Sequence, residues 1–170
     1  TKIRLTGGEP TLRQDLDRLI EGLASIPGLQ SLHMTTNGLT LENEAKFYRQ
    51  LGLSGINVSL DTLKPHRFLA ITRRPGLEKV LAGIETAIAA KFETIKMNVV
   101  LMAGVNDDEI IDFVDFVADK PVNVRFIEWM PFQQTEWSPS GMVSYHEMRQ
   151  RVEAHYPLTP IKTELSAVAK

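Results

Sequence analysis

The sequence predicts an α/β fold, an open and partial (β/α) barrel of about five strand–helix units. Short runs with a two-residue apolar period alternate with longer runs that carry an apolar stripe at helical spacing. Polar residues interrupt the expected strands, which fits a barrel with a ligand-filled interior better than a sheet buried on both faces. Because about five units cannot close an eight-stranded barrel, we expect the barrel to be incomplete.

Composition and net charge limit the classes of protein to which this chain can belong. The chain has 170 residues, of which 43% are hydrophobic and 24% charged, as in a soluble globular domain. Its net charge of −2 argues against a broad nucleic-acid surface, and no apolar run is long enough to cross a membrane. We therefore expect no nucleic-acid partner and no membrane association. The absence of cysteine excludes disulfides.

The first expected strand, in the stretch K-I-R-L-T-G-G-E-P, has two different faces. Lys2 and Arg4 alternate with Ile3 and Leu5, so two cations share one side of the strand. Lys and Arg are rarely buried without a partner, so that side should face a ligand or solvent.

The strand runs directly into a turn that leaves the backbone exposed. Gly7 and Gly8 carry no Cβ, so a ligand can approach the backbone N–H and C=O groups closely. Pro10 can begin the following helix at its first position. We expect a binding cradle at this turn.

The first two helices follow from their apolar spacing and from the residues that stop them. A helix is expected over Arg13–Ser25, where Pro27-Gly28 ends the pattern. The strand Leu29–Met34 comes next and leads into T-T-N-G. A second helix, Leu39–Leu51, ends at Gly52.

The third unit begins with a mostly apolar strand, Gly55–Leu60, in which Asn57 and Ser59 share one side. A charged loop follows and holds a short helix at Pro65–Ile71. Regular apolar spacing then predicts the long helix Leu77–Ala90.

The last two units follow the same pattern. The strand Thr94–Met102 has the polar residues Lys96 and Asn98 on one side. The helix Glu109–Ala118 follows it, with Asn106 or Asp107 as a credible N-cap. Val122–Glu128 is the fifth strand.

Order weakens beyond the fifth strand. Gln133–Met142 is a polar loop, and Ser144 begins a helix with a capping box that runs to about Ala154. We expect residues 1–156 to form the partial barrel and residues 157–170 to be a linker or the start of a C-terminal region.

Polar side chains follow almost every expected strand. The carboxyl ends of parallel strands meet at one edge of a sheet, and in both barrels and open sheets the ligand binds there. The sequence therefore predicts a ligand site at this edge.

The ordered motifs carry a specific resemblance. They are K-I-R-L-T-G-G-E-P (2–10), T-T-N-G (35–38), I-N-V-S-L-D (56–61), I-T-R-R (71–74), I-K-M-N-V-V-L-M-A-G-V-N-D-D-E (95–109) and V-R-F-I-E-W-M-P (124–131). In this order they resemble the molybdenum-cofactor biosynthesis protein A family, the radical S-adenosylmethionine GTP 3′,8-cyclases.

The resemblance implies a fold, an activity and cofactors. Members of that family hold S-adenosylmethionine on a [4Fe–4S] cluster in a partial barrel of the radical SAM type. They convert GTP to 3′,8-cyclo-7,8-dihydro-GTP, the first step of molybdopterin biosynthesis, and a pyranopterin monophosphate synthase acts downstream. The resemblance further implies a cytoplasmic lyase, and a homodimer is one assembly that it allows.

The resemblance also assigns the cofactor site. Gly7, Gly8 and Glu9 match the cradle that takes the amino group of S-adenosylmethionine, with Gly8 as the best single position. Ser59 and Met130 match positions that contact the same cofactor.

The substrate site follows in the same way. Arg4, Thr35 and Lys96 match positions that contact GTP, and Lys2 is an expected neighbour. A triphosphate needs charge-assisted donors, which Arg and Lys supply. Arg125 also points to the site, with its ligand unassigned.

One departure from the family is clear. The cluster ligands of the family lie in an N-terminal Cys-x3-Cys-x2-Cys loop and in a C-terminal cysteine set, and this chain has no cysteine. We expect these regions before Thr1 and after Lys170. The sequence therefore predicts no metal-binding and no catalytic residue here, and a piece that is inactive alone. The histidines show no metal-ligand spacing and are interpreted as surface or core residues: His33, His66, His146 and His155.

Two other classes stay open. A phosphate-binding α/β-barrel enzyme of the aldolase type would use Lys96 as a Schiff-base amine. A cysteine-free nucleotide-binding module without catalysis would use the same cations for binding alone.

Overall fold

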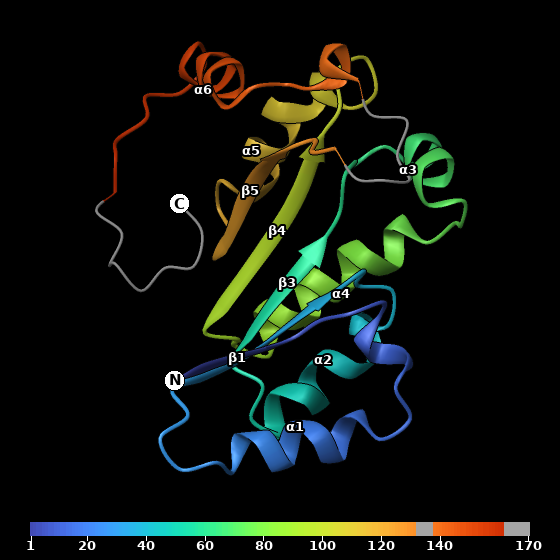
Figure 1. Cartoon of the computed structure of the whole chain (residues 1–170), viewed down its shortest axis with the longest axis vertical. Helices are drawn as coiled ribbons and strands as arrows, with labels where there is room; N and C mark the ends of the chain where they lie inside the picture. Colours follow the sequence, from blue (N-terminus) through green and yellow to red (C-terminus); the bar gives the residue numbers. More distant parts are fainter. Residues whose placement is uncertain (132–137, 162–170) are drawn as a thin grey trace.

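Five parallel strands form one open sheet in a computed structural model that describes residues 1–131 and 138–161. The strands lie side by side in chain order (Figure 1), so each crossover connects two neighbours. They are β1 (Lys2–Leu5), β2 (Ser31–Thr36), β3 (Gly55–Ser59), β4 (Thr94–Leu101) and β5 (Val122–Glu128). The predicted class, an open (β/α) barrel, is confirmed.

Helices fill the crossovers and extend the fold beyond β5. The α-helices are α1 (Leu16–Ala24), α2 (Leu41–Gln50), α3 (Pro65–Thr72), α4 (Leu77–Ala89), α5 (Ile110–Val117) and α6 (Tyr145–Glu153). Three short 3-10 turns are η1 (Pro10–Leu12), η2 (Asp107–Glu109) and η3 (Pro139–Gly141). None of the helices in the described part of the chain is long and apolar enough to cross a membrane.

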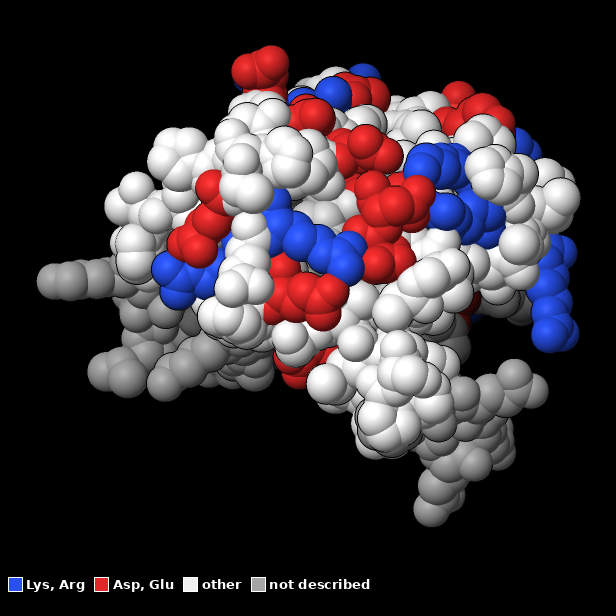
Figure 2. All heavy atoms as spheres, turned by 90° about the horizontal axis from the view of Figure 1, so that it is seen from above, with Lys and Arg blue, Asp and Glu red and all other residues white. Residues whose placement is uncertain are grey.

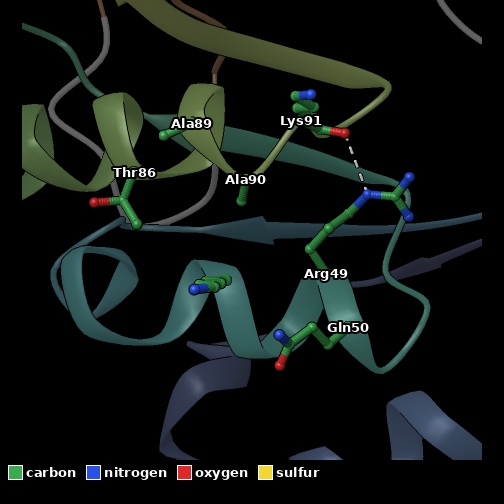
Figure 3. Close-up of a pocket in the computed structure, with 7 residues that line it drawn as sticks. Arg49, Gln50, Thr86, Ala89, Ala90 and Lys91 are labelled. Carbon is green, nitrogen blue, oxygen red and sulfur yellow. Dashed lines mark hydrogen bonds between the residues drawn. The ribbon is translucent and has the colours of Figure 1, made fainter.

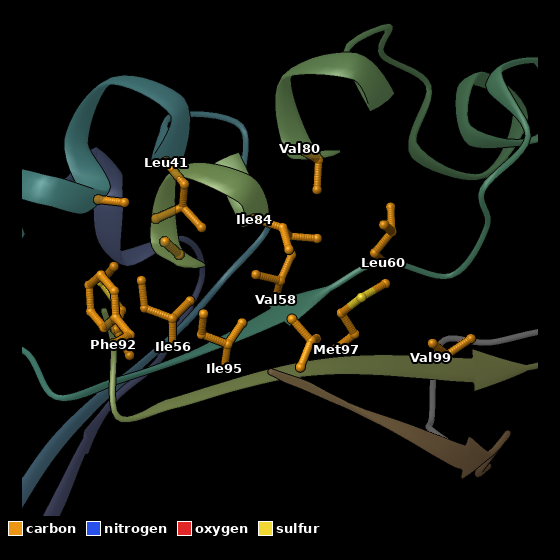
Figure 4. Packing of buried hydrophobic residues seen from close by; sticks show 14 of the residues in the cluster. Leu41, Ile56, Val58, Leu60, Val80, Ile84, Phe92, Ile95, Met97 and Val99 are labelled. Atoms are coloured by element: carbon orange, nitrogen blue, oxygen red, sulfur yellow. The ribbon is translucent and has the colours of Figure 1, made fainter. Parts of the chain in front are cut away.

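The core lies between one side of the sheet and the crossover helices (Figure 4). Alternate residues of the strands, such as Ile56 on β3 and Met97 on β4, are fully buried against α2 and α4. From the helices, Leu41, Val80 and Ile84 meet them. The two-residue period of the strands and the helical period of α2 and α4 thus bury one side of each element.

The boundaries differ from the predicted ones at the first helix and the second strand. The helix expected from Arg13 begins at Leu16, because Pro10–Leu12 forms a separate 3-10 turn and Arg13 is extended. The strand expected to end at Met34 continues to Thr36, where β-branched side chains keep the pairing with β3.

The predicted N-cap at Asn106 or Asp107 is wrong. The Asn106 amide is buried and donates to the carbonyls of Asp61 (2.6 Å) and Val100 (2.9 Å), while its Oδ1 accepts from the N–H of Met102 at 2.8 Å. An amide can donate and accept at once, so it ties the end of β3 to the end of β4.

The C-terminal end is described only in part. Ser144 caps α6, as predicted, and its Oγ accepts from the N–H of Glu147 at 3.3 Å. The predicted loop Gln133–Met142 and the predicted linker at 157–170 lie largely outside the described residues. Residues 157–161 contain no helix or strand.

Candidate functional site

The side of the sheet away from the helices is polar, and we call it the polar face. Residues paired across parallel strands point to the same side, so the register brings distant side chains together in rows. The rows are Arg4, His33, Gly55 and Thr94; then Thr35, Asn57, Lys96 and Asn123; then Ser59, Asn98 and Arg125.

Four cations from three strands gather on the polar face. Burial lowers the pKa of the Lys96 ammonium, and the charges of Arg125, Arg4 and Lys2 lower it further. None of the four makes an ion pair with any other described residue. Unpaired cations that repel one another form a site for an anion that can bridge them.

Asn57 lies at the centre of this face with its amide unsatisfied. Its side chain is 0% exposed, and neither Oδ1 nor Nδ2 has a partner within the described chain. Oδ1 of Asn98, in the next row, is also buried without a partner. Such groups are rare in folded proteins and indicate a bound molecule or water. In the sequence, Asn57 interrupts a mostly apolar strand and shares one side of it with Ser59, but the resemblance assigns it no role.

We predict that Asn57→Leu will stabilise the ligand-free chain by about 1–2 kcal/mol. Leu has nearly the shape of Asn, and it removes the desolvation cost of two unpaired polar atoms. Urea unfolding measures the change, with Asn43→Leu on the exposed side of α2 as the control. A loss of stability in Asn57→Leu would mean that the amide has a partner in the folded chain.

The G-G-E-P turn follows β1 directly at the edge of the polar face. Gly7 has a φ of +138°, which favours glycine, and both Gly7 and Gly8 are exposed. A Cβ built on either glycine would meet no other atom within 4 Å. The space above this backbone is therefore open to a ligand.

Glu9 holds the turn in place. Its carboxylate accepts from the hydroxyl of Thr36 and from the N–H of Asn37, both at 2.7 Å, and from the N–H of Thr11 at 3.2 Å. Glu9 thereby ties the turn to the end of β2, so it supports the cradle through its carboxylate rather than facing the open space itself.

The other predicted site residues divide into two groups. Thr35, Ser59, Lys96 and Arg125 lie on the polar face together with Lys2 and Arg4. Met130 follows β5 and is 51% exposed, so it lies beyond the rows.

A second network ties the loop after β3 to η2. The Glu109 carboxylate is 0% exposed and accepts from the Thr62 hydroxyl and the Leu63 N–H, both at 2.7 Å. Arg67 donates to Glu109 and also pairs with Asp108. No local pattern in the sequence indicates the pair of Arg67 and Glu109, because the two residues lie 42 positions apart. Basic and acidic side chains interleave on the face seen from above (Figure 2), as expected where such pairs link α3 to η2.

A hollow outside the polar face lies between α2 and α4 (Figure 3). It is lined by Lys46, Arg49, Gln50, Thr86, Ala89, Ala90 and Lys91. Arg49 donates to the carbonyl of Lys91 at 3.2 Å. We call it the α2–α4 groove, and it provides a matched set of cations away from the polar face.

The side chains present do not fit an iron–sulfur cluster. Such clusters need thiolate ligands, and the chain has no cysteine. No group of three or more His, Asp or Glu side chains that could hold a metal occurs in residues 1–131 and 138–161.

Residues 1–117 match the sequence pattern of the radical SAM superfamily. The chain belongs to this superfamily.

Solved structures share its fold at low sequence identity. A radical SAM methyltransferase from Sphaerobacter thermophilus is 16% identical with a TM-score of 0.69, covering 89% of this chain and 46% of that one. A domain of pyruvate-formate lyase-activating enzyme from Bacteroides vulgatus is 21% identical with a TM-score of 0.64, covering 88% and 89%.

Curated relatives are closer in sequence and confirm the resemblance that the ordered motifs indicated. The mitochondrial GTP 3′,8-cyclase of Arabidopsis thaliana is 47% identical over 156 residues, which are 92% of this chain and 40% of that protein. The GTP 3′,8-cyclase of Moorella thermoacetica is 43% identical over 94% of the chain and 50% of its own length. Molybdenum cofactor biosynthesis protein 1 of Homo sapiens is 44% identical over 99% and 27%. This radical SAM chain thus spans half or less of the length of these relatives.

Proposed function

We propose that this chain is the barrel part of a GTP 3′,8-cyclase that binds S-adenosylmethionine at the G-G-E-P turn and GTP on the polar face. One observation carries the proposal. Four cations without partners among the described residues converge beside an open glycine turn, in a chain 47% identical to a GTP 3′,8-cyclase. The reaction would be the conversion of GTP to 3′,8-cyclo-7,8-dihydro-GTP.

The glycine turn suits the methionine end of S-adenosylmethionine. Open space above Gly7 and Gly8 leaves backbone groups free to hydrogen-bond to an amino group or a carboxylate. When bound together with an iron–sulfur cluster, this cofactor supplies the radical chemistry of the superfamily. These 170 residues contain no cysteine, so they supply no thiolate ligand to that cluster.

The polar face suits a triphosphate. Arg4 can bind phosphate oxygens with two parallel N–H groups, while Lys2 and Lys96 act as point charges. Thr35 and Asn57, in the same row as Lys96, offer short hydroxyl and amide groups for the rest of the nucleotide. An anion among these cations would relieve the repulsion that lowers the pKa of Lys96.

Further parts of the proposal concern the cellular setting. The product would pass to a pyranopterin monophosphate synthase. A homodimer and a cytoplasmic location remain predictions, as does the division into a barrel at 1–156 and a linker at 157–170.

An aldolase-type enzyme is the second candidate, because the lowered pKa of Lys96 would also suit a Schiff-base amine. That class leaves the G-G-E-P turn without a role. Borohydride trapping of a carbonyl substrate on Lys96 would favour it.

A chimaera tests the proposed function. The chain replaces the matching 156-residue segment of the Arabidopsis enzyme, and the rest of that enzyme stays unchanged. We expect the chimaera to convert GTP in the presence of S-adenosylmethionine and a reductant, and Lys96→Met to abolish conversion. A folded chimaera that carries its clusters but does not convert GTP would contradict the proposal.

We predict that Gly8→Val will abolish S-adenosylmethionine binding and leave the fold intact. A Cβ at Gly8 meets no atom within 4 Å beyond its chain neighbours, so the new side chain projects into the open space that we assign to the ligand. Equilibrium binding to the chimaera measures the loss, and Gly22→Val on α1, which also meets no atom within 4 Å, is the control. Normal binding by Gly8→Val would place the cradle elsewhere.

A further inference from the structure

We propose that His33 makes triphosphate binding on the polar face proton-linked, so that the imidazole takes up a proton when the polyanion binds. The inference rests on the proposed function and adds a group that the resemblance does not assign. It starts from the position of the ring.

The ring of His33 has a fixed place on the polar face. His33 pairs in register with Arg4 on β1 and with Gly55 on β3. A Cβ at Gly55 would lie 2.7 Å from both Nδ1 and Cε1 of His33, so the imidazole lies against the bare backbone of β3. Any side chain at position 55 would require the ring to move, so Gly55 leaves the space that the imidazole occupies beside Arg4.

The ring nitrogens of His33 have no hydrogen-bond partners among the residues that the structure describes. Nδ1 is also buried. A neutral imidazole donates from one nitrogen only, whereas a protonated one donates from both. Because Nδ1 is buried against Gly55, protonation would make Nε2 a donor whichever tautomer the neutral ring has and would add a positive charge beside Arg4 for an anion in this row.

Burial and the surrounding charges both disfavour the protonated form of the His33 ring in the ligand-free fold. Burial lowers the pKa of His33, and the charges of Arg4, Lys96 and Lys2 lower it further. β3 places the backbone of Gly55 beside the ring, and Glu93, just before β4, raises the pKa by less than each of the three cations lowers it. A bound triphosphate offsets the three cations and brings negative charge next to the ring, so we expect the pKa of His33 to rise on binding.

The sign of the pH dependence follows from linkage. Proton uptake occurs at pH values between the lowered pKa of the free chain and the raised pKa of the complex. The affinity therefore increases as the pH falls through this window, by up to about tenfold for each unit of pKa rise. Phosphate groups titrate near pH 6 themselves, so the imidazole has to be observed directly.

Histidine ring NMR on the chain, with and without saturating inorganic triphosphate, tests the inference. His33→Gln assigns the His33 signal, because Gln keeps a polar side chain of similar length and does not titrate. We expect the His33 pKa to rise by at least about one unit with triphosphate. The ring signals of His66, His146 and His155, which are exposed, should look the same with and without triphosphate.

Calorimetry of triphosphate binding completes the test. We expect wild type to gain affinity over His33→Gln as the pH falls from about 8 to about 5.5, within the range where imidazole titrates. Binding that Lys96→Met weakens, together with an unchanged His33 pKa, would overturn this inference and leave the proposed function standing. Absence of triphosphate binding at millimolar concentration would contradict both.

Discussion

Replacing Lys96 with Met will weaken GTP binding about 10- to 150-fold and leave S-adenosylmethionine binding unchanged. A hydrogen bond to a charged group contributes about 1.5–3 kcal/mol, and about 1.4 kcal/mol corresponds to a factor of ten in affinity. Met keeps the length and the apolar stem of Lys, so the loss isolates the ammonium. Calorimetry with each ligand on the chimaera measures both affinities.

The α2–α4 groove supplies the control. Lys46→Met removes the same charge from a different surface and should leave GTP binding as in wild type. The lowered pKa of Lys96 shows that its charge is disfavoured in the ligand-free fold, so Lys96→Met should not destabilise the chain. Equal losses for both ligands, or a loss of the same size in Lys46→Met, would contradict the assignment.

Glu109→Ala will lower the free energy of unfolding by about 3–5 kcal/mol. The carboxylate is 0% exposed, and its removal leaves the Thr62 hydroxyl and the Leu63 N–H without an acceptor. Arg67 keeps only Asp108 as a partner. Urea unfolding at neutral pH measures the change.

Asp112→Ala is the matched control for this network. Asp112 lies on α5, its side chain is 53% exposed, and its carboxylate is 4.0 Å from the Lys64 ammonium. Exposed ion pairs contribute about 0–1 kcal/mol, so this variant should unfold almost as wild type does. If Glu109→Ala cost no more than Asp112→Ala, the buried pair would not stabilise the loop after β3.

The fold could be predicted because the apolar residues of each strand and each helix recur with the period of that element. Alternating apolar residues in the strands and apolar stripes in the helices are local signals, and they can be recognised without knowledge of the tertiary contacts. The two-residue period also placed Lys2 with Arg4 on one side of β1. That these cations share a face with Lys96 depends on register across β1 to β4, which a single strand does not encode.

Features that depend on contacts far apart in the chain could not be predicted. Glu9 bonds to Asn37, 28 residues away, and Glu109 bonds to Leu63, 46 residues away. The sequence predicts Glu9 as one part of a cofactor-binding motif and Asn106 as a helix N-cap. Each has backbone or side-chain partners that only the folded chain brings within reach.

A comparison of GTP with guanosine tests the central claim most directly, because the two ligands differ only in the triphosphate. In calorimetry on the chimaera, wild type should bind GTP far more tightly than guanosine. The double variant Arg4→Gln/Lys96→Gln should bind the two ligands about equally, whereas Lys46→Gln/Lys91→Gln in the α2–α4 groove should keep the wild-type preference. A double variant on the polar face that still prefers GTP as strongly as wild type does would contradict the account.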